Sequence, residues 1–452
     1  MKRDSSRCIR DIEEMFELSP GEIRRIVKDF HSEMRRGLSG RGSSLKMIPS
    51  YAGRPSGTEK GRFLALDLGG TNFRLQLIRL EGNRRIRSCM SESYVLKKRL
   101  LRGTGKKFFD FIAGRVEKFI DKNGKAGDED CKIGFTFSFP VKQTRVDNGI
   151  LIRWTKGFQI SGVEGKDVVK LLNESLKGRG LGYVSVVALA NDTVSTVAAK
   201  SYEDKNCDIG VILGTGTNAC YCEKRSNVLK VRKEAILPRG VFINMEWGNF
   251  SKIRSTAYDR ELDASSVNPG EQLLEKMVSG RYLGEIARLV LRDLKRRRAI
   301  FINRPISILD MPYRFKSEYM SMAESDNSKM MTRTDRLLKK LGINKSSAAD
   351  RRLLKRVCMA ISKRAACISA AAIFSVVTKI DSRVSRRHTI AVDGSVYEKY
   401  CGFPKKMRDA LKENFRLIDQ NRGVSRVRLS LTKNASGKGA AVIAAMSRAL
   451  AS

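Results

Sequence analysis

The sequence predicts a two-lobed α/β protein in which each lobe carries one copy of a repeated β-turn-β unit. The stretch "ALDLGGTNFRLQLI" at 65–78 has a counterpart in "GVILGTGTNACYCEK" at 210–224, and their Gly-Thr-Asn triplets are 146 residues apart. Each copy reads as an apolar strand, a glycine turn and a second strand, which is the pattern of a hairpin. The chain has 452 residues, of which 41% are apolar, enough for two lobes with a substantial core.

Composition excludes several classes of protein. The chain holds two histidines, His31 and His388, so a histidine-based metal site or a Ser-His-Asp triad has almost nothing to be built from. Nine scattered cysteines without a C-x-x-C pattern are typical of reduced cytoplasmic thiols, and we expect Cys220 and Cys222 to pack on one face of a strand. The N-terminus lacks the apolar segment of a conventional signal peptide. We expect no segment that is long enough and uncharged enough to cross a membrane.

The formal charge of +40 points either to an anionic partner or to a general bias of the surface. Basic residues occur along the whole chain, for example at 97–107, 294–298 and 351–356, where they interrupt apolar residues at helical spacing. That spacing is typical of solvated helix faces, so the sequence favours a diffuse basic surface with weak, non-specific polyanion contacts. A dedicated polyanion site stays open as the alternative, although no aromatic RNA-binding motif or zinc-finger spacing is present.

The first sixty residues read as a helix followed by a linker. Ser19 to Glu22 form a capping box with proline at the first helical position, and apolar residues at helical spacing extend the helix over 19–38. Residues 39–61 are rich in glycine, serine and proline and predict a loop or linker, with Met47 to Pro49 as its apolar anchor. The first strand of the repeat comes next.

The two glycine turns are candidates for a phosphate site, although the chain has no G-x-x-x-x-G-K-[ST] loop. Two hairpins that face each other can hold the phosphates of one nucleotide through backbone N–H groups, and a Cβ in the turn would block that approach. Asp67 repels phosphate, so we expect it beside Mg²⁺, directly or through water. The alternative is two ordinary hairpin turns without a ligand.

The second turn also fits the dinucleotide fingerprint G-x-G-x-x-A, from Gly214 to Ala219. The two interpretations differ in the element expected after the turn. A Rossmann turn opens a helix, whereas the segment "ACYCEK" alternates like a strand, so we favour the hairpin.

Polar side chains at strand ends between the repeats suit a ligand with many hydroxyl groups. One strand ends at Ser138, a second apolar strand ends in Trp154 to Phe158, and a helix is expected to start near Gly165 to Asp167. Each sugar hydroxyl both donates and accepts a hydrogen bond, so such a site needs amides and carboxylates.

Asp192 is the main candidate for a catalytic residue. An apolar strand runs from Val184 to Ala190, and Asn191-Asp192-Thr193 then opens a helix. An aspartate at such a junction is either the helix N-cap or a general base that takes the proton of a hydroxyl attacking phosphorus. Later segments supply further candidate ligands: Glu246, Gln272 and Glu275. The last two are three residues apart, on what we expect to be one helix face.

Taken together, these motifs resemble those of eukaryotic hexokinases. In chain order they are "LALDLGGTNFR", "GFTFSFP", "LIRWTKGF", "ALANDT", "LGTGTNACYCE", "INMEWG", "NPGEQLLEKMVSGRYLGE", "VDGSVY" and "SGKGAA". The resemblance runs from about Met47 to the C-terminus, and the segments on the sugar side are its most specific part. Three features depart from the family: Ala435 stands where a glycine-like residue is usual, Ile133 replaces a common leucine, and the surface is more basic.

The resemblance implies the two-lobed actin-like (ribonuclease H-like) ATPase fold of the hexokinase type. It implies residues 1–60 as a helix and linker packed on the large lobe, 61–190 with the C-terminal helix 436–452 as the small lobe, and 191–435 as the large lobe. ATP with Mg²⁺ and glucose would bind between the lobes. The reaction would be phosphorylation of the 6-hydroxyl of glucose and related hexoses, the first step of glycolysis. The length matches one catalytic unit, a monomer or homodimer in the cytoplasm, with a nuclear or unconventionally exported form left open.

The resemblance also assigns roles to individual residues. Asp192 is similar in position to the catalytic base, and Lys156 to a second catalytic residue; both would also contact the sugar. The remaining sugar ligands would be Ser138, Thr155, Asn191, Asn218, Glu246, Gln272 and Glu275. The nucleotide ligands would be Asp67, Gly70, Thr71 and Asn72 in the first turn, Gly214, Thr215, Gly216 and Thr217 in the second, and Gly394, Ser395, Ser436, Gly437 and Lys438 on the adenosine side. Asp67 would hold Mg²⁺ through water.

Overall fold

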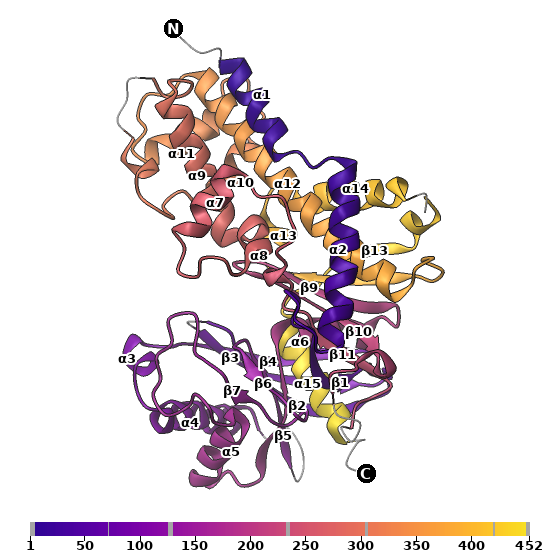
Figure 1. Cartoon of the computed structure of the whole chain (residues 1–452). Coiled ribbons are helices and arrows are strands. Elements are labelled where there is room, and N and C mark those ends of the chain that lie inside the picture. The colour runs from indigo at the N-terminus through magenta and orange to yellow at the C-terminus, as the bar shows by residue number, and fades with distance from the viewer. Residues whose placement is uncertain are drawn as a thin grey trace.

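The computed structural model has two lobes, each built on one mixed β-sheet (Figure 1). It describes residues 5–70, 72–124, 130–231, 236–302, 306–418 and 421–448. The strands are β1 (Ile48–Gly53), β2 (Lys60–Leu68), β3 (Asn72–Glu81), β4 (Ile86–Val95), β5 (Cys131–Phe137), β6 (Val141–Lys142), β7 (Ile150–Leu151), β8 (Val184–Ala190), β9 (Cys207–Leu213), β10 (Thr217–Lys224), β11 (Gly240–Asn244), β12 (His388–Asp393) and β13 (Val427–Leu431). The helices are α1 (Ser5–Phe16), α2 (Pro20–Leu38), α3 (Lys98–Leu101), α4 (Gly105–Asn123), α5 (Val168–Gly178), α6 (Asp192–Glu203), α7 (Ala257–Ala264), α8 (Leu273–Val278), α9 (Gly280–Arg296), α10 (Ser317–Ser325), α11 (Thr332–Lys340), α12 (Ala348–Ile380), α13 (Ser395–Lys399), α14 (Phe403–Leu417) and α15 (Ala435–Arg448).

The two main sheets have the same strand order, which agrees with the duplication seen in the sequence. One sheet runs β4-β3-β2-β5-β8, and the other runs β11-β10-β9-β12-β13, with β1 added beside β11. In each sheet the first three strands form an antiparallel meander. The last two strands then join in parallel. Each repeat is therefore one structural unit, and the sequence repeat marks the same hairpin in both.

Both glycine turns connect antiparallel strands. β2 and β3 pair on either side of the first turn, with Leu68 opposite Phe73. β9 and β10 pair on either side of the second turn, with Leu213 opposite Thr217. A strand and not a helix comes after the second turn, so the dinucleotide-fingerprint alternative is excluded.

Two helices, α6 and α15, lie between the sheets (Figure 1). α15 packs on α6 and on β2, β5 and β8, while α6 also packs on β9 and β10. The approach is close because α15 carries a glycine at the crossing: a Cβ on Gly439 would lie 1.8 Å from the carbonyl oxygen of Ser195. The C-terminal helix thus contacts the first sheet, while the lobe limits 61–190, 191–435 and 436–452 themselves stay a prediction.

The N-terminal region agrees with the predicted helix and differs in the linker. Ser19 and Glu22 make both hydrogen bonds of the capping box at the start of α2, and α1 and α2 pack on α12. The prediction of a linker over 39–61 is wrong for Ile48–Gly53, which form β1 and pair with β11. A proline normally argues against a strand, but β1 lies at the edge of the sheet, where a proline such as Pro49 is tolerated. The composition of the segment therefore did not predict this strand.

α12 contradicts the expectation of no membrane-length apolar helix. Among the described residues it is the one helix long and apolar enough to cross a membrane. Most of its apolar stretch is buried inside the protein, where α12 contacts α1, α2, α9, α10 and α14. These contacts are those of a core helix.

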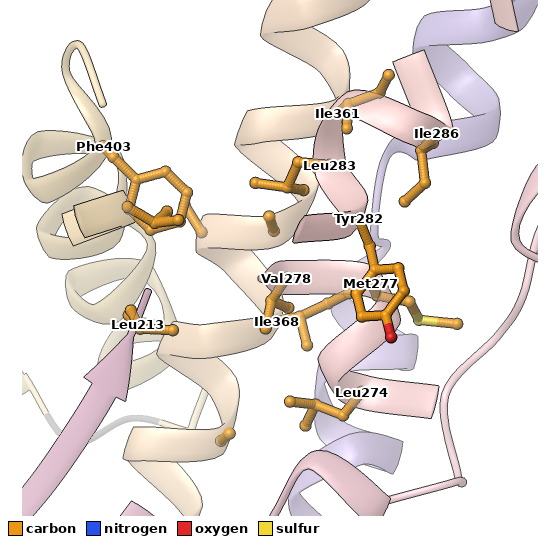
Figure 2. Packing of buried hydrophobic residues seen from close by; sticks show 14 of the residues in the cluster. Leu213, Leu274, Met277, Val278, Tyr282, Leu283, Ile286, Ile361, Ile368 and Phe403 are labelled. Carbon is orange, nitrogen blue, oxygen red and sulfur yellow. The ribbon is translucent and has the colours of Figure 1, made fainter. Parts of the chain in front are cut away.

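The core around α12 fixes the position of the second glycine turn (Figure 2). Leu213, the last residue of β9, belongs to the same buried cluster as Val278 of α8 and Ile368 of α12. The N–H of Gly280 donates to the carbonyl oxygen of Gly214 at 2.8 Å, which ties the turn to the start of α9. The turn and α8 are therefore held in a fixed relation.

Most of the cysteines and the two histidines take part in packing or hydrogen bonds inside the protein. None of the nine cysteines forms a disulfide, and Cys220 and Cys222 pack in one apolar cluster, as expected of residues two apart on a strand. His388 is buried and lies 3.1 Å from a carboxylate oxygen of Asp208. His31 lies 2.8 Å from the carbonyl oxygen of Ser375.

Candidate active site

Three aspartates lie at strand ends, and the charge of Asp192 raises the pKa of the other two. Asp67 lies near the end of β2, Asp192 comes after β8, and Asp393 ends β12. Burial, the charge of Asp192 and, less strongly, that of Asp393 raise the pKa of Asp67 to about 6. Burial also raises the pKa of Asp393, to which the charge of Asp192 contributes. Acidic side chains from both sheets therefore lie within electrostatic reach of one another.

Sequence reasoning missed Asp393, although its motif predicted the two residues after it. Its Oδ1 accepts a hydrogen bond from the N–H of Gly394 at 2.7 Å. The duplication of the sheet is the feature from which Asp393 could have been predicted. β12 occupies in the second sheet the place that β5 occupies in the first, so Asp393 at its end corresponds to the region of Ser138.

Asn191, and not Asp192, is the N-cap of α6. Its Oδ1 accepts hydrogen bonds from the N–H of Thr193 at 3.1 Å and from the Thr193 hydroxyl at 2.9 Å. Asp192 is the first residue of the helix; its Oδ1 accepts from the same N–H at 2.8 Å. Its Oδ2 has no hydrogen-bond partner in the described part of the chain. Capping therefore does not require Asp192, and one carboxylate oxygen is free to accept a proton.

Lys156 joins the first glycine turn to the end of β5. Its ammonium group donates to the carbonyl oxygens of Gly69 at 2.7 Å and Ser138 at 2.8 Å. The ammonium also lies 5.3 Å from the ring centre of Phe139. A lysine ammonium has three N–H donors, so one remains for a ligand.

The segment that carries Thr155 and Lys156 is a loop, not the end of a long strand. Only Ile150–Leu151 are extended there, as β7. Trp154 replaces strand pairing as the anchor: its indole N–H donates to the carbonyl oxygen of Ile160 at 2.9 Å, and its ring stacks on Phe158. Ring packing of this kind leaves no period-two pattern in the sequence, which explains the wrong prediction.

A network of amides and one carboxylate occupies the start of β10 and the end of β11. The amide of Asn218 donates to Asn244 Oδ1 at 2.8 Å and to Glu246 Oε1 at 3.1 Å. Asn244 in turn donates to Glu246 Oε1 at 2.9 Å and accepts from the Thr193 hydroxyl at 3.4 Å. The network reaches from Glu246 to the N-cap of α6. Asn244 was not predicted, although it lies in the quoted "INMEWG" motif, two residues before Glu246.

Three predicted sugar ligands have left-handed backbone conformations. The φ angles are 57° at Lys156, 53° at Glu246 and 55° at Gln272. Such angles cost energy for residues with a Cβ and are concentrated at functional sites. The angle at Gln272 also corrects the prediction of one helix face with Glu275, because Gln272 precedes α8 and only Glu275 lies in it.

Two glycines allow Gln272 and Glu275 to approach the strands. A Cβ on Gly248 would lie 2.2 Å from Gln272 Oε1, and a Cβ on Gly216 would lie 2.6 Å from Glu275 Oε2. That oxygen accepts from the N–H of Thr217 at 2.9 Å. Burial raises the pKa of Glu275, with a further contribution from the charge of Glu246. The second glycine turn is thus packed directly against a candidate sugar ligand.

The two glycine turns differ in their packing. A Cβ on Gly70 would meet nothing within 4 Å, so that side of the first turn is open. In the second turn a Cβ on Gly214 would lie 3.5 Å from Gly394 and 3.6 Å from the backbone nitrogen of Ser395. The first of the two predicted adenosine segments therefore adjoins the second turn. Asn72 begins β3 and is exposed, Thr215 is exposed, and Thr71 lies outside the described residues.

The structure does not bring Lys438 to the turns. Its ammonium lies 4.0 Å from Glu203, at the opposite end of α6 from Asp192. The carbonyl oxygen of Ser436 accepts from the Thr136 hydroxyl at 3.0 Å, and a Cβ on Gly437 would lie 1.8 Å from Gln76 Oε1. These contacts pack α15 against the first sheet, and a nucleotide role for 436–438 stays a prediction.

The carboxylates fit a magnesium ion that is shared with phosphate. Carboxylate oxygens are the ligands Mg²⁺ prefers, and the ion usually keeps several waters and binds one or two carboxylates together with phosphate. Among the described residues no three His, Cys, Asp or Glu side chains lie close enough to hold one ion. Asp67 would therefore supply part of the coordination shell, beside the open first turn.

The chain is similar to known proteins over almost its whole length. Two protein-family profiles, both described as hexokinase, match residues 8–202 and 208–446. Hexokinase-2 of Oryza sativa subsp. japonica is 40% identical over 453 residues, which cover 97% of this chain and 90% of the rice protein. The Hexokinase-like 1 protein of Arabidopsis thaliana is 39% identical, over 94% of this chain and 87% of the relative. A solved hexokinase from Schistosoma mansoni, complexed with glucose, has a TM-score of 0.84 and 35% identity, and covers 98% of this chain and 100% of its own.

These matches span both lobes and agree with the predicted actin-like fold. Another solved hexokinase has a TM-score of 0.85 at 31% identity, over 98% of this chain. The acids, the two glycine turns and the polar network thus lie in a fold whose solved members include a sugar complex. The chain belongs to the hexokinase family, the enzymes that transfer phosphate from ATP to a hexose.

Proposed function

We propose that the chain transfers the γ-phosphoryl group of ATP to the 6-hydroxyl of glucose, with Asp192 as the general base. The observation that supports the proposal most strongly is the position of Asp192 between the proposed phosphate and sugar sites. On one side its charge acts on Asp67, beside the first glycine turn. On the other side its neighbour Thr193 connects to Asn244 and Glu246. A base for this reaction has to border on both the phosphate and the sugar.

The polar network would hold the sugar in a fixed orientation. Asn218 and Asn244 donate to one oxygen of Glu246, so this carboxylate is held in place while its other oxygen can accept from a hydroxyl. Glu275 would accept in the same way, and the remaining N–H of Lys156 would donate. Fixed hydrogen-bonding groups remove the need to order the reactants at the moment of reaction.

The chain's own groups would prepare the phosphoryl transfer. Asp192 Oδ2 would accept the proton of the attacking hydroxyl, and the backbone N–H groups of the two turns would bind phosphate oxygens. Mg²⁺, when bound with ATP, supplies charge neutralisation of the phosphates. Asp67 is the residue that would hold it, in part through water.

A hexose panel tests the proposal. ADP formation is followed in a coupled assay with ATP, Mg²⁺ and glucose, mannose or fructose in turn. We expect sugar-dependent ADP release with glucose, and the panel ranks the other hexoses. ADP release that no hexose stimulates would contradict a hexose kinase.

Glucose should close the lobes, because its proposed ligands come from both: Ser138 and Lys156 from one, Glu246 and Glu275 from the other. Closure also excludes water, which would otherwise compete as the acceptor. Arg153 and Glu271, beside these ligands, already form an ion pair at 3.6 Å between the two sides. We expect small-angle scattering to show a smaller radius of gyration with glucose. An unchanged radius at a saturating sugar concentration would count against closure.

Gly248→Ala should weaken sugar binding, because the new methyl group would displace the side chain of Gln272. We expect the KM for glucose to rise by about tenfold or more, since small misplacements in a site are costly, with the KM for ATP changed less. Gly178→Ala is the matched control, because a Cβ there meets nothing within 4 Å and φ is not positive. Equal KM values for glucose in both variants would remove Gln272 from the sugar site.

A cytoplasmic monomer or homodimer with weak polyanion contacts completes the proposal. None of the nine cysteines forms a disulfide, which supports a reducing compartment. For the charge of +40, we expect binding to nucleic acid or anionic vesicles that is independent of sequence and is lost between low and physiological salt. Affinity is measured against salt before and after neutralising Lys295 to Arg298. Sub-micromolar binding at physiological salt that disappears with this cluster would contradict a diffuse surface.

A further inference from the structure

Three arginines lie side by side across three strands of the first sheet. Arg62 of β2 is directly opposite Arg79 of β3, and Arg79 is directly opposite Arg87 of β4. Residues directly opposite each other in antiparallel strands point to the same face, with their Cβ atoms about 5 Å apart. Together with Ser88 and Cys89 these residues line a surface pocket of about 320 Å³.

A β-bulge shapes the edge of this pocket. Leu77 pairs with Met90 and Ile78 pairs with Ser88, so Cys89 is the extra, unpaired residue of β4. A bulge re-aims the side chains around it and is common next to functional sites. The bulge thus places the extra residue, Cys89, at the rim of the pocket.

No described carboxylate neutralises the three guanidinium groups. Within the described part of the chain Arg62, Arg79 and Arg87 form no ion pair and no side-chain hydrogen bond, whereas the clustered Arg296 and Arg297 both pair with Asp293. Like charges directly opposite each other destabilise a sheet. The row is therefore a concentration of positive charge that no described acid pairs with.

We propose that this pocket binds the phosphomonoester group of a small ligand. Arginine forks match phosphate oxygens with paired N–H donors, and a phosphomonoester carries a charge of about −1.5 to −2 at pH 7. Three guanidinium groups provide donors without a competing acid among the described residues. The volume is at the low end for small-molecule sites, which suits a phosphate with a short organic part.

The pocket is separate from the active site. Arg62 lies five residues before Asp67 on the same strand, which corresponds to roughly 17 Å of extended chain. Cys89, which is exposed, provides a local reporter, and Cys401, also exposed, provides an internal reference far along the chain. Occupation of the pocket can thus be measured without reference to catalysis.

Alkylation of Cys89 tests the proposal. The rate of modification by iodoacetamide is followed at Cys89 and Cys401 by peptide mass spectrometry, with increasing glycerol 2-phosphate or with sodium chloride at matched ionic strength. We expect saturable protection of Cys89 by glycerol 2-phosphate, none by sodium chloride, and no change at Cys401. Arg79→Gln should weaken the protection roughly tenfold or more, the effect of losing one charged hydrogen-bond donor.

Control experiments test whether the variant is still folded and whether the ligand is a free phosphate or a lipid headgroup. Arg85→Gln removes an exposed arginine from the turn before β4 and should leave protection unchanged. Arg79→Gln should melt no lower than the parent, because it relieves repulsion. Vesicles with phosphatidic acid, against phosphatidylcholine alone, form a second arm; protection that needs these vesicles assigns the phosphomonoester to a lipid headgroup. Absence of protection in both arms, or protection that persists in Arg79→Gln, would overturn the proposal.

Discussion

Asp192→Asn should lower turnover at least ~10²-fold, the low end for loss of a positioned base, and should leave glucose affinity within about tenfold. Asparagine keeps the shape of the side chain and an oxygen that can accept from the Thr193 N–H, the one hydrogen bond in which the Asp192 side chain takes part among the described residues. It removes the basic oxygen. Steady-state kinetics together with glucose titration by calorimetry separate the effect on chemistry from the effect on binding.

Asp192→Ala provides the comparison that distinguishes a base from a structural residue. It should lose turnover to a similar extent as Asp192→Asn, while its stability falls more because the Thr193 N–H loses one acceptor. Asn191 still caps the helix in both variants. Turnover of Asp192→Asn within a few-fold of the parent would assign Asp192 to the helix end and not to catalysis.

Asp67→Asn should stabilise the ligand-free protein and at the same time lower its activity about 10²-fold or more. Burial and the neighbouring acids raise the pKa of Asp67 to about 6, so its charged form is disfavoured in the folded state. Replacing it with a neutral amide removes that penalty, on the order of 1–3 kcal/mol of unfolding free energy at pH 8. Activity falls because the carboxylate that would hold Mg²⁺ is lost.

The pH dependence of the two effects comes from the direction of this shift. Above about pH 6 Asp67 is charged in the folded and unfolded chain, so the variant has its full advantage. As the pH falls toward 3.8, the folded protein takes up the proton first and the advantage disappears. Parent activity should decline as the pH falls through about 6. Chemical unfolding at pH 8 and pH 4.5 checks the sign; a variant that is less stable at pH 8 would contradict it.

Most of the fold could be predicted from the sequence because the repeat and the strand-to-helix junctions are local patterns. Periodicity and capping residues are enough to predict the two hairpins, the capped helix α2 and the succession of β8 and α6. The failures have a different origin. β1 is specified by its pairing with β11, where Ile48 lies opposite Asn244, and not by its own composition. The loop around Trp154 is set by aromatic packing, which has no period.

The candidate site was predicted less completely than the fold. Residue types at strand ends indicated Asp192, Glu246 and Glu275. Asn244 and Asp393 were missed because their roles depend on which strands become neighbours, and a single sequence does not state that. For Lys438, which a family motif suggests as a nucleotide ligand, the structure shows an ion pair with Glu203, and the nucleotide role stays a prediction.

The position of the transferred phosphate tests the central claim most directly. The enzyme is incubated with ATP, Mg²⁺ and glucose labelled with carbon-13 at C6, and the product is examined by phosphorus-31 and carbon-13 NMR. The proposed geometry predicts a single sugar phosphate in which phosphorus couples to the labelled carbon, and predicts that Asp192→Asn forms it at least ~10²-fold more slowly. A phosphate on another hydroxyl, or release of inorganic phosphate with unmodified glucose, would contradict the account.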